Sequence, residues 1–159
     1  MNLKKKILAG IVTYNRSALL ERCIKALKLQ VKIDNIELSL FVINNSSTDD
    51  TEELLNSYQV SYITLKNKGA VYGWQKLIKY SIDQKFDYLW LMDDDGYPDK
   101  HSLKFLLEFA NKKDFAMLNS LIIDENNHEE LAFPLPILNS YGFPKTFSIP
   151  RKIYSKNKI

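Results

Sequence analysis

Three consecutive carboxylates, Asp93, Asp94 and Asp95, follow a short apolar run over residues 88–92. Adjacent carboxylates repel one another, and each raises the pKa of its neighbours unless a cation neutralises them. Carboxylate oxygens are the ligands that hard divalent cations prefer. Because side chains alternate along an extended chain, Asp93 and Asp95 are expected to point one way and Asp94 the other. The triplet therefore predicts a divalent-cation site, and the alternative is a solvated acidic turn before a helix.

Three other apolar runs also end in polar or glycine-containing segments, at residues 13–16, 44–51 and 67–73. The glycines of the last segment would allow a ligand to approach the backbone, although a tight turn with positive φ is the simpler local explanation. Arg16, in the first segment, would suit a phosphate group, although an arginine ahead of a helix is more often a surface ion-pair partner.

The segments that carry these residues alternate between strand and helix patterns. Apolar runs of strand length predict strands over residues 7–13, 38–43, 60–65 and 88–92, and the first of these runs is rich in β-branched residues. Apolar residues spaced by three and four predict a helix after the first, third and fourth strands, and a capping-box spacing predicts a short helix after the second. The inward faces are expected to hold Leu20, Cys23, Ile24 and Leu27, then Trp74, Leu77, Ile78, Ser81 and Ile82, and finally Leu103, Leu106, Leu107 and Ala110.

Local signals predict where some helices begin. Ser17 is expected to cap the first helix, Asp49 and Glu52 have the spacing of a capping box, and Pro98 suits the start of the last helix. Residues 115–118 resemble a fifth strand, and residues 121–123 either extend it or form a hairpin through the turn that follows.

Alternation of strands and helices predicts an α/β fold with an open, mostly parallel, Rossmann-like sheet and helices on both faces. The carboxyl ends of parallel strands meet at one edge of such a sheet, and ligands bind there. All four polar segments are expected at that edge, so their convergence carries more weight than any single segment.

Composition limits the class of protein. The chain has 159 residues, 45% of them apolar, which suits one globular domain. Its single cysteine excludes an intramolecular disulfide and a cysteine-built zinc site. The basic residues after position 131 are expected to be solvated, with no nucleic acid partner. No pattern of a signal peptide or transmembrane segment is present, so a cytoplasmic location is expected.

Two common nucleotide-binding signatures are missing. The first predicted strand is followed by neither G-x-G-x-x-G nor a P-loop sequence. By contrast, the segments at residues 12–16, 43–49, 67–73 and 90–95 resemble, in this order, the motifs of family 2 glycosyltransferases with a GT-A fold. The triple aspartate is most similar to the rhamnosyl- and galactofuranosyl-transferase branch.

The resemblance implies a nucleotide-diphospho-sugar donor, UDP- or dTDP-linked, held through Mg²⁺ or Mn²⁺. It also implies a role for each matching residue. Val12, Thr13 and Tyr14 would flank the base, Asn45 would contact it, Asn67 and Gly73 would border the nucleotide, and Arg16 would meet phosphate. Asp93 would lie near the ribose or the metal, Asp94 near the sugar, and Asp95 would be a metal ligand.

Two positions depart from the family's pattern. Asn44 stands where an aspartate is common, and Leu77 replaces a small residue, so the donor preference is open. The resemblance covers about residues 5–125, which predicts a donor domain over residues 1–125 and an irregular basic tail over residues 126–159.

Inverting transfer needs a carboxylate base on the acceptor side, and in the family it lies in a later motif. The catalytic base is therefore expected outside this chain, in a longer enzyme that acts on a cell-surface glycan or lipid-linked acceptor, in the cytoplasm or at the inner face of the membrane. Acids within residues 124–130 would be substitutes for that base. The alternative is a non-catalytic nucleotide- or Ca²⁺-binding interaction module.

Overall fold

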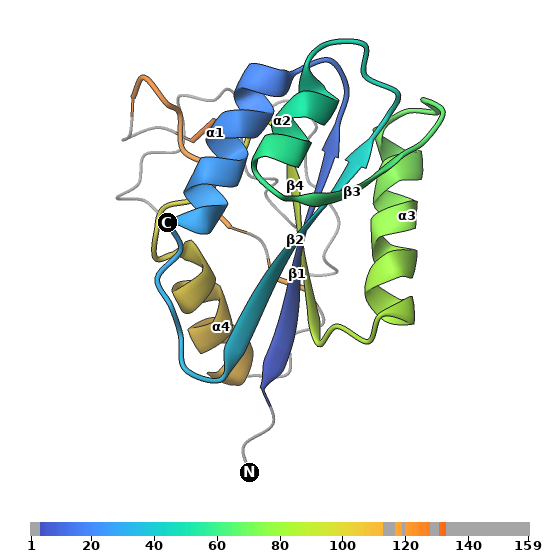
Figure 1. Ribbon diagram of the computed structural model, residues 1–159. Helices are drawn as coiled ribbons and strands as arrows, with labels where there is room; N and C mark the ends of the chain where they lie inside the picture. The colour runs from blue at the N-terminus through green and yellow to red at the C-terminus, as the bar shows by residue number, and fades with distance from the viewer. Residues whose placement is uncertain (1–3, 113–116, 119, 128–130, 133–159) are drawn as a thin grey trace, which may run out of the picture. The chain divides into compact units, whose positions relative to one another are not determined.

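The computed structural model describes residues 4–112, 117–118, 120–127 and 131–132. The chain divides into two units, residues 1–112 and 113–159, and each is described by itself. The first unit alternates strands and helices as the sequence predicts (Figure 1). Its elements are β1 (Lys5–Thr13), α1 (Ser17–Lys28), β2 (Ile36–Asn44), α2 (Thr51–Ser57), β3 (Ser61–Thr64), α3 (Ala70–Asp83), β4 (Tyr88–Asp93) and α4 (Ser102–Lys112).

The four strands form one parallel sheet in the order β3-β2-β1-β4. β1 is a central strand, and its residues from Ile7 to Thr13 are buried, as expected of a strand covered on both faces. The predicted α/β class, with an open parallel sheet, is confirmed.

Helices cover both faces of the sheet. Ala9 and Ile11 of β1 pack with Leu20, Ile24 and other apolar residues of α1, whereas Leu8 and Val12 point to the other face. There they meet Leu77 of α3. In Figure 1, α3 lies on one side of the sheet, and α1, α2 and α4 lie on the other.

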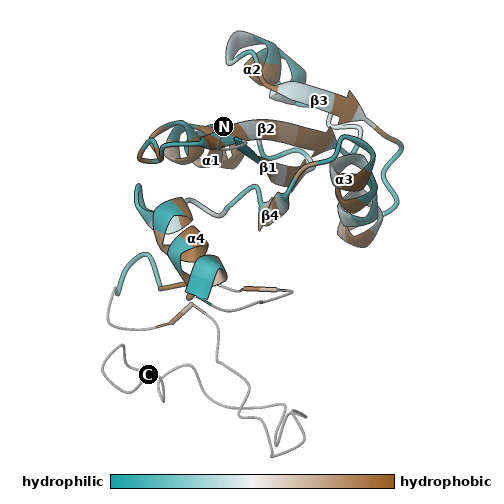
Figure 2. Cartoon of the chain, turned by 90° about the horizontal axis from the view of Figure 1, so that it is seen from below, coloured by the Kyte–Doolittle hydropathy of each residue, from teal (hydrophilic) through white to brown (hydrophobic). Residues whose placement is uncertain are grey.

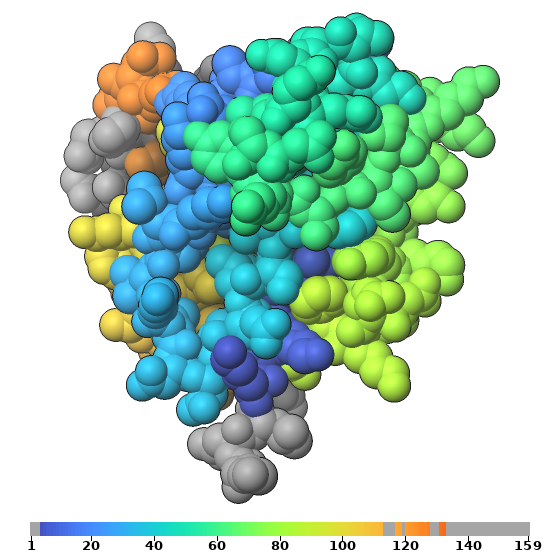
Figure 3. Space-filling view, in the orientation of Figure 1, coloured from blue at the N-terminus to red at the C-terminus, as the bar shows by residue number. Residues whose placement is uncertain are grey.

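The hydropathy colouring agrees with this layering, because the helices carry both polar and apolar residues while β2 is largely apolar (Figure 2). α1 and α2 pack side by side on one face, which the space-filling view also shows (Figure 3). The packing of α1 also matters for the polar edge of the sheet, because α1 begins at Ser17, directly after the short loop that follows β1.

The buried stripe of α3 differs from the prediction. Gly73, Leu77 and Ser81 are buried, whereas Ile78 is 44% exposed and Ile82 is 69% exposed. The stripe is shifted because Gly73 lies against Val12 of β1: a Cβ atom at Gly73 would come within 2.7 Å of Val12 Cγ1. The absence of a side chain lets the helix approach the sheet on that line.

The start of α4 also differs from the prediction. The helix begins at Ser102 and not at Pro98, and Leu103 and Leu107 are its buried residues. The Asp99 carboxylate instead accepts a hydrogen bond from the backbone N–H of His101 at 2.8 Å. The turn formed in this way separates the proline from the helix.

In the second unit, Ile123 and Leu131 form an isolated antiparallel bridge. The Asp124 carboxylate accepts hydrogen bonds from the backbone N–H groups of Asn126 and Asn127, which orders the turn. This arrangement agrees with the hairpin alternative. Residues 115–116 of the predicted fifth strand, and residues 133–159 of the predicted tail, lie outside the described residues.

Within the described part of the chain, no helix is both long enough and apolar enough to span a bilayer.

Candidate functional site

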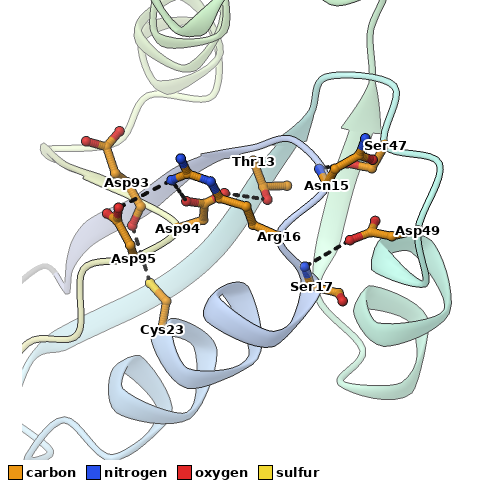
Figure 4. A network of polar contacts seen from close by, with 10 residues as sticks. All are labelled: Thr13, Asn15, Arg16, Ser17, Cys23, Ser47, Asp49, Asp93, Asp94 and Asp95. Carbon is orange, nitrogen blue, oxygen red and sulfur yellow. Dashed lines mark hydrogen bonds and ion pairs between the residues drawn. The ribbon is translucent and has the colours of Figure 1, made fainter.

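The polar segments meet at the carboxyl edge of the sheet, as the strand order requires. Val12 lies opposite Asp93 in the pairing of β1 with β4, and Thr13 lies opposite Asn44 in the pairing of β1 with β2. The loops after β1, β2 and β4 are therefore neighbours (Figure 4). The residues at the end of β4 are called the acidic loop (residues 93–95), and those at the end of β2 are called the β2 loop (residues 44–50).

Asp94 is the buried member of the acidic loop, with only 4% of its surface exposed. Its Oδ2 accepts a hydrogen bond from Thr13 Oγ1 at 2.8 Å, and its Oδ1 lies 3.3 Å from Arg16 Nη1. A buried charge is costly unless it is paired and hydrogen-bonded, and Asp94 is both. The carboxylate is therefore held in place by the last residue of β1 and by Arg16 of the loop that follows.

Asp95 is exposed and shares the same cation. Arg16 Nη1 lies 3.3 Å from Asp95 Oδ2, and the two side chains are 53% and 56% exposed. One nitrogen contacts both carboxylates, so Asp94 and Asp95 do not point in opposite directions. The predicted alternation is wrong at this point because β4 ends at Asp93 and the next two residues form a turn.

Asp93 is the member of the triplet that points away from Arg16 (Figure 4). Burial raises the pKa of its carboxyl, the charges of Asp95 and Asp94 raise it further, and Arg16 lowers it by less. The ionised form of Asp93 is thus short of positive charge in its surroundings. A cation bound nearby would relieve this cost.

The donor set suits a hard divalent ion, since it consists of carboxylate oxygens. However, the described residues contain no group of three acidic, histidine or cysteine side chains arranged to hold a metal on their own. A divalent ion at the acidic loop would therefore need further oxygen ligands from a bound molecule, such as a diphosphate.

The β2 loop is held by a network of hydrogen bonds around a buried amide. Asn44 is fully buried, and its Nδ2 donates to Glu52 Oε1 at 3.2 Å and to Thr64 Oγ1 at 3.4 Å. Its Oδ1 accepts from the backbone N–H of Ser47 at 2.9 Å. The amide thus uses both its donor and its acceptor side, which a carboxylate at this position would not do.

Asn15 ties the loop after β1 to the β2 loop. Its backbone N–H donates to Ser47 Oγ at 3.0 Å, and its Oδ1 accepts from the backbone N–H of Thr48 at 2.7 Å. Asn15 has a φ of 52° and Ser46 one of 57°, in the left-handed region that asparagine tolerates best among non-glycine residues. The reciprocal hydrogen bonds hold both loops in this conformation.

Asp49 joins two helix starts, a role that the sequence did not reveal. Its Oδ2 accepts the backbone N–H of Ser17 at 3.1 Å, and its Oδ1 accepts the backbone N–H of Thr51 at 3.2 Å. Burial opposes ionisation, but the hydrogen bonds from Thr51 and Ser17 leave the pKa of Asp49 below its usual value.

The predicted caps are therefore wrong. Ser17 is the first residue of α1 and not its cap, and its hydroxyl donates to Asp50 Oδ1 at 2.6 Å. Glu52 does not complete a capping box, because its carboxylate accepts the hydroxyl of Thr64 at 2.6 Å. An acid from the neighbouring loop replaces the local cap, since the loops after β1 and β2 are adjacent.

Asn45 has a buried acceptor that is not used. Its backbone N–H donates to the carbonyl of Thr13 at 2.9 Å, and the residue is 3% exposed. Its side-chain Oδ1 is buried and accepts no hydrogen bond from any described residue. Leaving such an atom unpaired costs about 1–3 kcal/mol.

The remaining predicted residues are spread around this edge. Tyr14 is 47% exposed, whereas Val12 is buried against Gly73. Asn67 lies on the loop after β3, where its Oδ1 accepts the backbone N–H of Gly69 at 2.9 Å, and Gly69 has a φ of 87°. The structure thus brings Thr13, Arg16, Asp94 and Asp95 into contact and explains both glycines without a ligand.

α1 makes one further contact with the acidic loop and one with Tyr97, two residues beyond it. Cys23 Sγ lies 3.8 Å from the carbonyl oxygen of Asp93, and the guanidinium of Arg22 lies 4.2 Å from the centre of the Tyr97 ring. Burial, and then the nearby aspartates, raise the pKa of the Cys23 thiol to about 12, so the thiol is neutral. Its predicted place in the core is confirmed, whereas its contact with Asp93 was not predicted.

Comparison with known sequences finds a match to the family described as "Glycosyl transferase family 2" over residues 9–155. A galactofuranosyltransferase of Mycolicibacterium smegmatis is 29% identical over 133 residues, which are 81% of this chain and 43% of that protein. The chain therefore spans less than half the length of this curated relative.

Two solved structures share the fold. TarS 1–349 of S. aureus in complex with UDP has a TM-score of 0.59 and 20% identity, covering 68% of this chain and 32% of that one. A mannosyltransferase of Pyrobaculum calidifontis in complex with GDP-Man and Mn²⁺ has a TM-score of 0.55 and 14% identity, covering 69% and 33%.

Proposed function

Because the chain belongs to glycosyl transferase family 2, we propose that it binds the nucleotide-diphospho-sugar donor of a glycosyltransferase. The observation that carries this proposal is the acidic loop at the carboxyl edge of the parallel sheet, where ligands bind in open α/β folds. There Arg16 contacts Asp94 and Asp95, while Asp93 is short of positive charge.

A divalent ion, Mg²⁺ or Mn²⁺, would neutralise the charge that develops on the leaving diphosphate. We propose Asp95 and Asp93 as its protein ligands because their carboxylates are the accessible ones of the triplet. Asp94 is buried and hydrogen-bonded to Thr13, so its proposed role is to fix the loop close to the sugar. The fold is shared with a neighbour that holds GDP-Man and Mn²⁺, which supports a divalent ion as the cofactor.

We propose that the base lies between the loop after β1 and the β2 loop, close to Val12, Thr13 and Tyr14. The unpaired Oδ1 of Asn45 supports this placement, because uracil and thymine both present an N–H donor between two carbonyl acceptors. Since this oxygen is buried, the β2 loop would have to shift for a base to reach it. An asparagine side chain offers the matching acceptor and donors. This placement agrees with a UDP- or dTDP-linked sugar, and Asn67 would border the nucleotide from the loop after β3.

Transfer with inversion requires a base that removes the proton of the acceptor hydroxyl. The residues that meet at this site are suited to bind and orient the donor, and the acceptor, a cell-surface glycan or lipid-linked glycan, is proposed to bind elsewhere in a longer enzyme. That the donor domain extends over residues 1–125 stays a prediction.

Calorimetric titration of the chain with UDP and dTDP, with and without Mn²⁺, tests the donor site. We expect one of the two nucleotides to bind, and to bind more tightly when Mn²⁺ is present. Binding of neither nucleotide under any metal condition would contradict the proposal. Ca²⁺ binding that UDP leaves unchanged would support a metal-binding interaction module instead.

A further inference from the structure

Arg16 is placed where it competes with a metal ion. Its Nη1 lies 3.3 Å from Asp94 Oδ1 and 3.3 Å from Asp95 Oδ2, between the two carboxylates. A single positive charge thus occupies part of the space that a divalent ion would need at Asp95. The sequence alone suggested a phosphate contact or a surface ion pair, and the structure shows the ion pair.

The two contacts are weak for their type. Charge-assisted hydrogen bonds between a guanidinium and a carboxylate are usually 2.7–2.9 Å long and often use two nitrogens, whereas Arg16 uses one nitrogen at 3.3 Å. More than half of its side chain is exposed, and exposed ion pairs contribute little to stability. The guanidinium is therefore held loosely enough to be displaced.

The two aspartates differ in how they would respond to that displacement. Asp94 keeps its hydrogen bond from Thr13 whether or not Arg16 moves, because that contact uses the other carboxylate oxygen. Asp95 is 56% exposed, and its contact in the structure is with Arg16. Removing Arg16 would thus free Asp95 for a metal while Asp94 stays in place.

A diphosphate would give the displaced side chain a better partner. The planar guanidinium matches the oxygens of a phosphate group and binds them through paired hydrogen bonds. Arg16 lies at the start of α1, on the same edge as the aspartates, so a change of side-chain torsion angles is enough to redirect it. The cost of breaking its contact with Asp95 would then be offset only when the nucleotide is present.

We propose that Arg16 is a positioning residue that exchanges between Asp95 and the donor diphosphate, and so makes metal and nucleotide binding depend on each other. This inference rests on the proposed function and adds a coupling to it. Mn²⁺ alone must compete with Arg16, whereas Mn²⁺ with a diphosphate need not. Because coupling between two ligands is reciprocal, Mn²⁺ tightens nucleotide binding by the same factor.

The test compares Mn²⁺ affinity, measured by the electron paramagnetic resonance signal of free Mn²⁺, in the wild-type chain and in Arg16→Ala. Without nucleotide, Arg16→Ala should bind Mn²⁺ about two- to fivefold more tightly, since the competing charge is gone. With saturating UDP, Arg16 no longer competes with the metal in the wild type, so the two proteins should bind Mn²⁺ within about a factor of two of each other. The ratio of the Mn²⁺ affinity with UDP to the Mn²⁺ affinity without UDP is therefore smaller in Arg16→Ala than in the wild type.

Lys25→Ala is the matched control. It removes one positive charge from the same helix, at an exposed residue paired with Glu21 and not with the aspartates. Both Mn²⁺ affinities should stay within a factor of two of the wild-type values. Arg16→Lys keeps the charge but not the planar fork, so its Mn²⁺ affinity without nucleotide should match that of the wild type while the UDP-dependent gain falls. Thermal unfolding checks that each variant is folded.

The outcomes separate this inference from the proposed function. Unchanged or weaker Mn²⁺ binding by Arg16→Ala without nucleotide overturns the exchange, whatever UDP does. An unchanged ratio of the two affinities overturns it as well. If the wild-type chain binds no nucleoside diphosphate, the proposed function fails, and tighter Mn²⁺ binding by Arg16→Ala would show only that Arg16 and the metal compete.

Discussion

The acidic loop and the β2 loop lie at the same edge of the sheet but are stabilised in opposite ways. In the β2 loop, Asn44 is buried and every polar atom of its amide group is hydrogen-bonded. In the acidic loop, Asp94 and Asp95 share one loosely held guanidinium, and Asp93 points away from it. The first arrangement suits a rigid surface, and the second leaves negative charge for a ligand to neutralise. The difference indicates which loop shapes the site and which binds charge.

If the β2 loop is a rigid support, its central amide should be essential for stability. Asn44→Ala removes the hydrogen bonds to Glu52, Thr64 and the backbone of Ser47 and leaves a cavity where a fully buried amide was. We expect a loss of about 3 kcal/mol in the free energy of unfolding, measured in urea. Asn67→Ala, which removes one exposed contact, is the control and should cost less than about 1 kcal/mol. Similar losses in the two variants would contradict the rigid-support description.

Asp94 is the one member of the acidic loop that resembles the β2 loop, because it is buried and hydrogen-bonded. Thr13→Val keeps the side-chain shape and removes the 2.8 Å hydrogen bond to Asp94. We expect a loss of about 2 kcal/mol in the free energy of unfolding, since a buried charge loses a donor. In Asp94→Asn, where no buried charge depends on Thr13, adding Thr13→Val should cost less. Equal costs in the two backgrounds would show that the hydrogen bond contributes nothing specific.

Asp49 joins the two loops, so its removal should loosen both helix starts. Asp49→Asn should lower the free energy of unfolding at pH 7 by about 1 kcal/mol, the usual contribution of a helix cap. The pKa of Asp49 is lowered in the folded state by hydrogen bonds from Thr51 and Ser17, although burial opposes this. Its contribution is therefore present above the unfolded value of 3.8 and is lost as the pH falls through the folded pKa.

The measurement is urea unfolding of the wild type and Asp49→Asn between pH 7 and pH 2.5. The difference between them should shrink as the pH falls below 3.8. Asp50→Asn, one residue along, is the matched control for loss of charge. A difference that stays constant across this range would mean that the ionised form of Asp49 has no special role.

Asp93 should behave in the opposite sense and so sharpen the contrast between the loops. Its pKa is raised by burial and by the neighbouring aspartates, so the ionised form costs free energy in the folded state. The free energy of unfolding of the wild type therefore falls by this cost as the pH rises from 3.8 through the folded pKa. Asp93→Asn should therefore be slightly more stable at pH 7, by less than about 0.5 kcal/mol, with no gain below pH 3.8.

Thermal unfolding at pH 7 and at a pH below 3.8 checks this prediction. Asp83→Asn, at the exposed end of α3, is the control. A clear loss of stability in Asp93→Asn at pH 7 would show that its carboxylate already has its partners within the protein, as the amide of Asn44 does.

The sequence was sufficient for the sheet, the edge and the family, because these depend on long patterns. Apolar runs located β1, β2 and β4 to within two residues, and the ordered motifs identified the family that the comparisons confirm. The galactofuranosyltransferase relative agrees with the predicted branch. What failed depends on contacts across loops. The cap of α1 comes from Asp49, and Asp94 and Asp95 share Arg16, neither of which local spacing can show.

The glycines illustrate the same limit. Gly69 was explained correctly by positive φ, but Gly73 is needed for the approach of α3 to Val12, a contact between residues far apart in the sequence. Asn44 departs from the family's pattern, and the sequence alone shows only that a negative charge is lost there. Its three hydrogen bonds give the physical reason for an amide at this position.

The most direct test of the account is the affinity for UDP, measured by calorimetry with and without Mn²⁺, in the wild-type chain and in Asp95→Ala. The account predicts that Mn²⁺ tightens UDP binding to the wild type by about tenfold or more, and that Asp95→Ala loses this gain. The Mn²⁺-free UDP affinity of Asp95→Ala should not fall, because Arg16 no longer has to leave Asp95 to reach the diphosphate. Equal UDP affinity of the two proteins in the presence of Mn²⁺ would contradict it.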